Sequence, residues 1–385
     1  PGWWRRGRDV VLAGAMLGVG ATQALLFRGF ASRGAEYPIF LVREALAVLG
    51  FCLAGILLTR GLPDQRVLRA LFAGYAGFVG IAFAISSPIG GNAARLLFLM
   101  AAPLLLLPLA ARGFRPRGVV VAFVAGTILW QSLPAVAGWQ TASSGRARDE
   151  AFWYPVIAFV EEHGDPGHRV QVVATADNWE AYYLARRGVP LARGWFRQDD
   201  FPANAALYEP LTPRRYRAWM RRTAVRYVFL PDDPLDYSAR AEAELLRSGR
   251  SGLREVARLG GWTVFALPNA TPIVTPAEDA EVLELTAESI TLRVARPGVY
   301  RLRLRYTPYW RVDGAAACAA PREPWGTDLR VAETGVVRLA FAVRLGTFVG
   351  AVLGDEGGCG AAVHGPQVPW AARARATAAS PGDAP

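Results

Sequence analysis

The sequence predicts an α-helical membrane bundle of about five spans, followed by an extracytoplasmic α/β subdomain and an antiparallel β-sandwich. Three observations favour this fold class. Apolar runs alternate with short Arg-bearing loops as far as Gly138. Strand and helix patterns alternate after that point, and from about Thr275 the apolar residues recur with a period of two. A chain of 385 residues also exceeds one ordinary core, so several structural units are expected.

Five apolar runs have about the 20 residues that a helix needs to cross a bilayer. The N-terminal segment and the loops on the same side of the membrane hold nine Arg residues, whereas the loops on the opposite side hold only Arg28, Arg33 and Arg95. Since basic residues collect on the cytoplasmic side, the C-terminal part is expected outside the cytoplasm of a multi-pass cell-membrane protein. The predicted transmembrane region is 1–140, with spans near 10–27, 38–58, 68–85, 93–111 and 119–138.

The charge of the chain does not indicate a nucleic-acid partner. The formal net charge is +11, and all 43 basic residues are Arg, which is typical of a coding bias toward GC-rich codons. A nucleic-acid interface would gather its charge on one face together with aromatic residues. Here the Arg residues lie largely in loops between apolar runs, so the expected partner is the lipid bilayer.

The loop Ser86–Arg95, between the third and fourth predicted spans, is a candidate anion site. It contains Asn92 and ends with Arg95 at the head of a helix. A helix N-terminus beside a guanidinium suits the phosphate of a lipid-linked sugar donor. The alternative interpretation is a tight turn whose Arg95 reaches toward the lipid headgroups.

The predicted α/β subdomain covers 150–270. A buried strand at 170–175, a helix at 178–187 and a short strand at 189–192 predict a parallel arrangement. We expect Asp177 to cap the helix. The strand-to-helix turn Thr175-Ala176-Asp177 contains no Gly, which argues against a dinucleotide enzyme.

The loop 193–200 (RGWFRQDD) is a candidate acceptor or sugar site. It combines two aromatic residues, two Arg residues and two carboxylates. Sugar sites use such stacking faces beside carboxylates, and carboxylates can do acid–base work. The candidate contacts are Trp195, Arg197 and Asp199. The alternative is a docking loop that packs its aromatic side chains onto a neighbouring unit.

Later elements of the α/β subdomain have clear local signals. Thr212 followed by Pro213 predicts a helix start. Tyr216, Trp219 and Met220 fall at helical spacing and are expected in the core. The pattern then predicts a strand at 225–230, a helix at 239–248, and a hairpin of strands 253–259 and 262–267 across Gly260-Gly261.

The predicted β-sandwich covers 275–366, and an Ala/Arg/Pro-rich tail at 367–385 is expected to be disordered. Alternation of apolar and polar residues at 290–294, 300–306 and 337–343 predicts strands with one buried face. Cys318 and Cys359 both lie in the aqueous part. In an oxidising compartment they can form a disulfide, and two free thiols are the alternative.

No cofactor motif is identified in the sequence. His163, Asp165, His168 and the preceding Glu residues are interpreted as a polar helix end, because no metal-ligand spacing fits them. A divalent metal stays an open question, and no metal-ligating or catalytic residue is assigned. Signatures of serine hydrolases, zinc proteases, P-loop NTPases and kinases are absent from the sequence.

Four segments together resemble large bacterial integral membrane proteins. The chain is similar to the YfhO family and, more distantly, to the GT-C superfamily of lipid-phosphosugar-dependent glycosyltransferases, through SPIGGNAARLLFL, NWEAYYLARRGVPLARGW, AVRYVFLPDDPLD and YRLRLRYTPYWRVDG. YTPYWRVDG looks like the aromatic–Pro–x–Trp strand of the YfhO-like C-terminal sandwich. The resemblance covers most of the chain beyond about Ser86, and its motifs are structural rather than catalytic.

The resemblance implies a membrane glycosyltransferase that takes a sugar from a polyprenyl-phosphate donor to an envelope glycan. In the GT-C superfamily the catalytic carboxylate typically lies in the first outer loop. We expect this sequence to be the C-terminal part of a longer polytopic protein, with that carboxylate outside it. The alternative is a non-enzymatic envelope scaffold, or a lipid or polymer transport component, with an extracytoplasmic binding domain.

Overall fold

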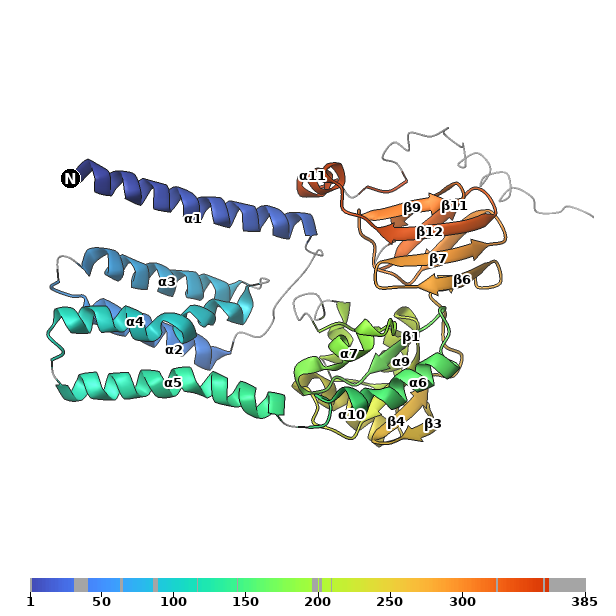
Figure 1. The fold of residues 1–385 in the computed structure, drawn as a ribbon, viewed down its shortest axis with the longest axis horizontal. Helices are drawn as coiled ribbons and strands as arrows, with labels where there is room; N and C mark the ends of the chain where they lie inside the picture. The colour runs from blue at the N-terminus through green and yellow to red at the C-terminus, as the bar shows by residue number, and fades with distance from the viewer. Residues whose placement is uncertain are drawn as a thin grey trace, which may run out of the picture.

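A computed structural model describes residues 2–30, 41–62, 65–85, 89–115, 117–143, 145–195, 200, 203–208, 210–322, 325–355 and 357–359. Within these residues, long helices come first and three four-stranded sheets follow in the C-terminal half (Figure 1). The predicted tail at 367–385 lies outside the described residues.

The N-terminal part consists of long apolar helices, and consecutive helices run in opposite directions (Figure 1). Two helical stretches in the described part, Arg66–Ala84 and Val120–Gln140, are long and apolar enough to cross a membrane by length and composition alone. Only 22% and 6% of their apolar windows are buried inside the protein. The helices are α1 (Gly2–Phe30), α2 (Val42–Leu58), α3 (Arg66–Ala84), η2 (Gly90–Ala94), α4 (Arg95–Ala111) and α5 (Arg117–Ser143).

The helices α2, α3 and α4 pack around a small apolar cluster. Phe51 and Phe72 meet edge to face, with ring centroids 5.4 Å apart. Gly55 permits this approach, because a Cβ there would lie 2.4 Å from the Phe72 ring. At the end of α2, Arg112 donates from Nε to the Leu58 carbonyl at 2.9 Å, which satisfies a carbonyl left over by the helix.

The α/β unit is built on one mixed sheet. The strand order is β1-β2-β4-β3, with β1 and β2 parallel and the other pairs antiparallel. A parallel bridge between Val170 and Leu191 adds a third parallel segment. The strands are β1 (Arg169–Val172), β2 (Val225–Pro231), β3 (Arg254–Leu259) and β4 (Trp262–Ala266). The helices are η3 (Glu150–Trp153), α6 (Tyr154–His163), η4 (Ala176–Asn178), α7 (Glu180–Arg186), η5 (Ala205–Leu207), α9 (Pro213–Arg222), η6 (Tyr237–Ala239) and α10 (Arg240–Arg247).

Helices cover both faces of this sheet. Val228 packs into the cluster that α9 and α10 form, whereas Phe229 packs into the cluster of α6 and α7. A strand buried on both faces must be apolar at successive positions, which explains the near-continuous run in β2. Tyr216, Trp219 and Met220 are buried, so the predicted core positions of α9 are confirmed.

Two local predictions about helix starts had different outcomes. Thr212 accepts a hydrogen bond from the Arg215 amide at 3.3 Å, as expected of a helix cap. The expected cap at Asp177 is wrong, because Asp177 adopts φ 63 within η4. No side chain caps α7 itself, although Thr175, which precedes η4, accepts from the Trp179 amide through its Oγ1 at 3.1 Å.

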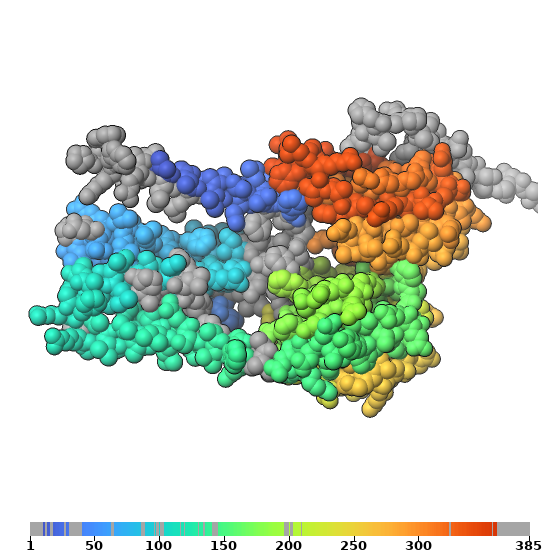
Figure 2. Space-filling view, viewed as in Figure 1, coloured from blue at the N-terminus to red at the C-terminus, as the bar shows by residue number. Residues whose placement is uncertain are grey.

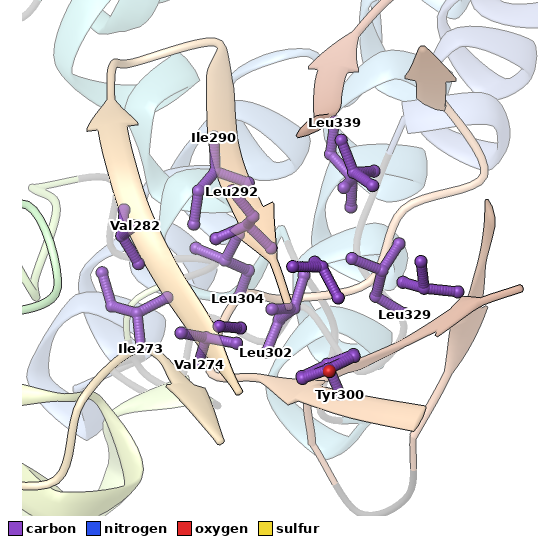
Figure 3. Packing of buried hydrophobic residues seen from close by; sticks show 14 of the residues in the cluster. Ile273, Val274, Val282, Ile290, Leu292, Tyr300, Leu302, Leu304, Leu329 and Leu339 are labelled. Carbon is purple, nitrogen blue, oxygen red and sulfur yellow. The ribbon is translucent and has the colours of Figure 1, made fainter. Parts of the chain in front are cut away.

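The C-terminal unit contains two antiparallel sheets that face each other. Their strand orders are β10-β11-β8-β5 and β6-β7-β12-β9. Leu292, Leu302, Leu329 and Leu339 point into the space between the sheets (Figure 3). The strands are β5 (Val274–Thr275), β6 (Ala280–Leu285), β7 (Ser289–Val294), β8 (Gly298–Leu302), β9 (Trp310–Gly314), β10 (Ala317–Pro321), β11 (Thr327–Val331) and β12 (Gly335–Phe341).

The predicted alternation continues past Phe341, but the strand ends there and a helix follows, α11 (Leu345–Leu353). The sequence analysis did not predict this helix. The chain after α11 returns to the sandwich, where Cys359 forms a disulfide with Cys318 of β10. The alternative of two free thiols therefore does not describe this structure.

Candidate functional site

The parallel segments of the α/β sheet have their carboxyl ends along the same edge of the sheet. Thr175 follows β1, Arg193 follows the third parallel segment, and Asp233 follows β2. The Asp233 carboxylate accepts hydrogen bonds from the amides of Arg146 (2.7 Å) and Ala147 (3.0 Å), which come shortly after α5. Since η4 also contacts α5, this edge lies against the end of the helical part (Figure 1). Open α/β sheets bind ligands outside the carboxyl ends of their strands.

A buried ion pair lies at this edge. Arg193 donates from Nε to Asp200 Oδ1 and from Nη2 to Asp200 Oδ2, each at 2.9 Å. The two side chains are only 6% and 2% exposed. Asp200 also accepts from Asn204 Nδ2 at 2.9 Å and from the Tyr208 hydroxyl. A buried carboxylate with this many donors is held as a structural anion, so Asp200 is not free to act as a base.

Arg193 also lines a cavity of about 400 Å³ between the α/β unit and the sandwich. Its Nη2 donates to Ser238 Oγ at 2.9 Å, while its Nη1 is buried without a hydrogen-bond partner in the described part of the chain. Buried donors are nearly always satisfied in folded proteins, so this nitrogen is an exception among the described residues. The polar and aromatic lining includes Arg169, Arg193, Trp195, Thr286, Ser289 and Trp310.

Arg169 joins the two units on either side of this cavity. Its Nη1 donates to the Thr223 carbonyl at 2.9 Å in the α/β unit and to the Arg303 carbonyl at 2.8 Å in the sandwich. Burial lowers the pKa of Arg169 to about 10, which leaves the guanidinium charged at neutral pH. A second contact, from the Ile273 amide to the Gly167 carbonyl at 2.7 Å, holds the same junction.

Two further carboxyl groups are buried behind the ion pair. Glu242 accepts from the Tyr216 hydroxyl at 2.6 Å and from Gln171 Nε2 at 3.2 Å. Glu180 accepts from the Thr175 hydroxyl at 2.7 Å. Burial raises the pKa of each carboxyl to about 7, although their hydrogen bonds and the charge of Arg193 act in the opposite direction. Both therefore gain a proton just below neutral pH.

A second polar cluster lies at the opposite end of β1. Asp165 accepts from His168 Nδ1 at 2.9 Å and from Arg226 Nη1 at 2.6 Å. The hydrogen bond from His168 is the main reason that the pKa of Asp165 falls to about 2. His168 lines two hollows of about 310 and 540 Å³, and its Nε2 is buried without a partner among the described residues. Within the ranges that the structure describes, no group of three or more His, Cys, Asp or Glu side chains is placed to hold a metal ion.

The structure places the predicted donor-phosphate residues in the helical part. Asn92 lies in η2, and Arg95 begins α4 with an exposed side chain. Tyr75 fixes this turn, because its hydroxyl donates to the Ala93 carbonyl at 2.8 Å and accepts from the Leu97 amide at 3.2 Å. The start of α4 is at the end of the helices that faces the α/β unit (Figure 1).

The predicted acceptor loop is described only in part. Trp195 lines the 400 Å³ cavity and is 60% exposed. Arg197 and Asp199 lie outside the described residues, as do residues 86–88 of the candidate donor loop. The structure thus brings Trp195 together with Arg193, which the sequence analysis placed in the loop but did not select as a site residue.

The sequence analysis also missed the buried carboxyl groups, although a signal was present. Glu242 precedes Leu245 and Leu246 by three and four residues, so it shares their face of α10. Glu180 precedes Leu184 by four residues in the same way. A charged residue on the apolar face of a short helix predicts a buried polar partner.

Comparison of the chain with protein-family models, with curated proteins and with solved structures finds no match.

Proposed function

We propose that the chain is a multi-pass protein of the cell membrane, with the α/β unit and the sandwich on the extracytoplasmic side. The exposed apolar side chains of its helices support this placement, among them Ile81 of α3 and Leu129 of α5. A water-soluble protein would cover such a surface, whereas lipid covers it in a membrane. The Arg-rich ends of α2 and α4 lie away from the C-terminal units, as the positive-inside rule requires for this orientation.

The cavity beside Trp195 is proposed to bind a sugar-bearing ligand. The observation that carries this proposal is the buried Arg193, whose Nη1 has no partner among the described residues, next to the exposed indole of Trp195. The apolar face of a sugar ring packs against an indole, and its hydroxyl or phosphate oxygens accept hydrogen bonds from a guanidinium. A concave lining with a few convergent polar groups is the usual form of such a site.

Transfer of a sugar is the activity that we propose for this arrangement. A polyprenyl-phosphate donor would place its phosphate at Asn92 and Arg95, and an envelope glycan acceptor would contact Trp195, Arg197 and Asp199. The acceptor oxygen would form a new bond to the sugar carbon as the bond to the donor phosphate breaks, with inversion at that carbon. The proton of the acceptor hydroxyl would go to a carboxylate base.

Binding without transfer is the second candidate, and one observation favours it. The described residues that line the cavity include no Asp or Glu, and Asp200 is engaged by Arg193. A cavity of this kind holds a ligand but offers no base. The protein would then act as an envelope scaffold or as a lipid or polymer transport component.

The test uses the full chain in lipid nanodiscs with radiolabelled polyprenyl-phosphate sugars and envelope glycan fragments. Arg95→Ala should weaken donor binding about 10-fold to 100-fold, since it removes a charge-assisted hydrogen bond. Trp195→Ala should weaken glycan binding about tenfold. Tyr154→Ala is the matched control, because Tyr154 is a similarly exposed aromatic residue on α6 that does not line the cavity.

The outcomes separate the two candidates. Transfer that both site variants reduce and Tyr154→Ala leaves intact would support the glycosyltransferase. Glycan binding that depends on Trp195 but gives no product would support the binding protein. A folded protein that binds neither donor nor glycan would contradict both.

A further inference from the structure

The helix α11 has an apolar surface that the described part of the chain leaves uncovered. Its sequence, LGTFVGAVL, contains no charged residue, and none of its side chains is fully buried. Leu345, Val349 and Leu353 are 79%, 46% and 77% exposed. They are spaced by four residues, so they form one stripe along the helix. Exposed apolar patches of this kind mark interaction surfaces.

This helix is held firmly on the sandwich. Thr347 closes its first turn, since its Oγ1 accepts from the Arg344 amide at 3.1 Å and donates to the Arg344 carbonyl at 2.8 Å. Gly354 ends it in the left-handed region, at φ 93. The disulfide from Cys359 to Cys318 then ties the following segment to β10. The exposed stripe is therefore displayed by a fixed element rather than by a loose tail.

The end of α1 lies against α11 at Phe348, which adjoins the exposed stripe. The ring of Phe30 is 5.2 Å from that of Phe348 and 5.3 Å from that of Tyr309. The Tyr309 hydroxyl donates to the Gly29 carbonyl at 2.7 Å. Gly29 makes this contact possible, because a Cβ there would lie 2.4 Å from the Phe348 ring. Both views show the C-terminal end of α1 beside α11 (Figures 1 and 2).

We infer that α11 lies in the outer interface of the bilayer, with Leu345, Val349 and Leu353 inserted among the lipid chains. The inference rests on the membrane placement proposed above, because α1 sets the depth. If α1 crosses the bilayer, its last residues lie at the outer surface, and α11 contacts those residues. The occupant is lipid, since the apolar surface of α1 continues directly into that of α11.

Length and flanking charge agree with this placement. A helix of nine residues is too short to span a bilayer, so it can only lie along the surface. Arg28 in the last turn of α1 and Arg344 before α11 are both exposed and can reach the phosphate layer. The consequence is that α11 anchors the sandwich to the membrane and fixes the orientation of the cavity beside Trp195.

The test places an environment-sensitive fluorophore on the full chain in phosphatidylcholine nanodiscs, with and without lipids that carry a spin-label quencher. Val349→Cys reports on α11, Leu129→Cys on α5, and Val299→Cys on the exposed face of β8. All Cys variants are made with Cys52→Ala, which removes the free thiol and leaves the disulfide intact. Leu353→Cys is a second reporter on α11, one turn further along.

We expect about a twofold loss of emission at positions 349 and 353 in quencher lipid, and none at position 299. Quenching at 129 but not at 349 or 353 would overturn the inference while leaving the membrane proposal in place. No quenching at 129 would overturn the membrane proposal itself. If 349 and 353 are shielded from aqueous iodide but not quenched by lipid, a protein surface covers α11, and the inference is wrong.

Discussion

The α/β unit and the β-sandwich bury different kinds of side chain. Among the described residues, the buried charged side chains are Glu180, Arg193, Asp200 and Glu242, and all four belong to the α/β unit. The cluster inside the sandwich consists of aliphatic side chains and Tyr300 (Figure 3). In the sandwich, the pair of Arg293 with Glu281 lies on the surface.

This difference indicates that the two units have different roles. Burial of charge costs free energy, and apolar replacements are often as stable or more stable, so stability alone does not explain the network around Arg193. That network lies at the edge of the sheet that faces the helical part and at the wall of a cavity. The interior of the sandwich is apolar, as expected of a unit that supports the site. The sandwich also forms the opposite wall of the cavity, where Arg169 of the α/β unit binds to it. Four predictions test whether the contrast is real.

The largest effect should come from Arg193→Met. This change leaves Asp200 buried and charged without its cationic partner, which should lower the free energy of unfolding of the α/β unit by about 3–5 kcal/mol. Hydrogen exchange of the β2 amides, measured on the full chain in micelles, reports this loss. Asp200→Asn in the same chain removes the second charge and should recover most of it. A cost below about 1 kcal/mol for Arg193→Met would show that the pair is not energetically buried.

Leu339→Ala should destabilise the sandwich by about 2–5 kcal/mol. Leu339 is fully buried on β12, between the two sheets, so the truncation leaves a cavity that the sheets cannot close. The readout is hydrogen exchange of β7 and β12. Val336→Ala on the same strand is the control, because Val336 is exposed and should cost about 0.5 kcal/mol or less. Equal costs would mean that the apolar interior is not what holds this unit.

The two units should also differ in pH dependence. Burial raises the pKa of Glu180 and Glu242 from an ordinary 4.5 to about 7. Between these values the folded state holds protons that the unfolded state has released, so the stability of the α/β unit should fall as pH rises from about 4.5 to 7. Each carboxyl contributes on the order of 2–3 kcal/mol.

Glu242→Gln should remove about half of that slope while Glu180 keeps the rest. The sandwich has no buried carboxylate among its described residues, so its stability should be nearly flat over the same range. Unfolding measured at pH 5, 6 and 7 for both units gives the comparison. A flat profile for the α/β unit would mean that these carboxyl groups are solvated.

Periodicity was enough to predict much of this architecture. The alternation at 290–294 and the helical spacing of Tyr216, Trp219 and Met220 each reflect one buried face, which a local pattern records directly. The start of α7 depended on backbone detail. Asp177 adopts a left-handed conformation and does not cap the helix, and no local sequence pattern reveals that backbone conformation.

The candidate site was less predictable, because its members come together only in the folded sheet. Arg193, Asp200 and Asn204 are close in sequence, but Ser238, which also contacts Arg193, comes from a distant element. Local sequence propensities do not reveal contacts between residues that are far apart in the sequence. The cysteine pair shows the same limit: spacing left the disulfide and free thiols both open, and only the fold brings Cys318 and Cys359 together. The short helix α11 was not predicted from the sequence, because its apolar residues continue the alternation of β12.

The smallest effect should come from the surface pair of the sandwich. Arg293 Nη1 and Glu281 Oε2 are 2.7 Å apart across β6 and β7, with side chains 60% and 64% exposed. Arg293→Ala should cost only about 0.2–1 kcal/mol, because water screens the pair and both side chains lose rotamer freedom in forming it. Hydrogen exchange of β6 and β7 at low and high salt provides the measurement, and high salt should abolish the cost.

Arg193→Met, measured in the same two buffers, should keep its cost at high salt, because salt does not reach a pair buried on both sides. The Arg193 pair is bidentate and buried, whereas the Arg293 pair has one hydrogen bond and is exposed, so the two pairs differ in both geometry and burial. Should Arg293→Ala prove as costly and as insensitive to salt as Arg193→Met, the contrast between the units would not lie in where they place their charges.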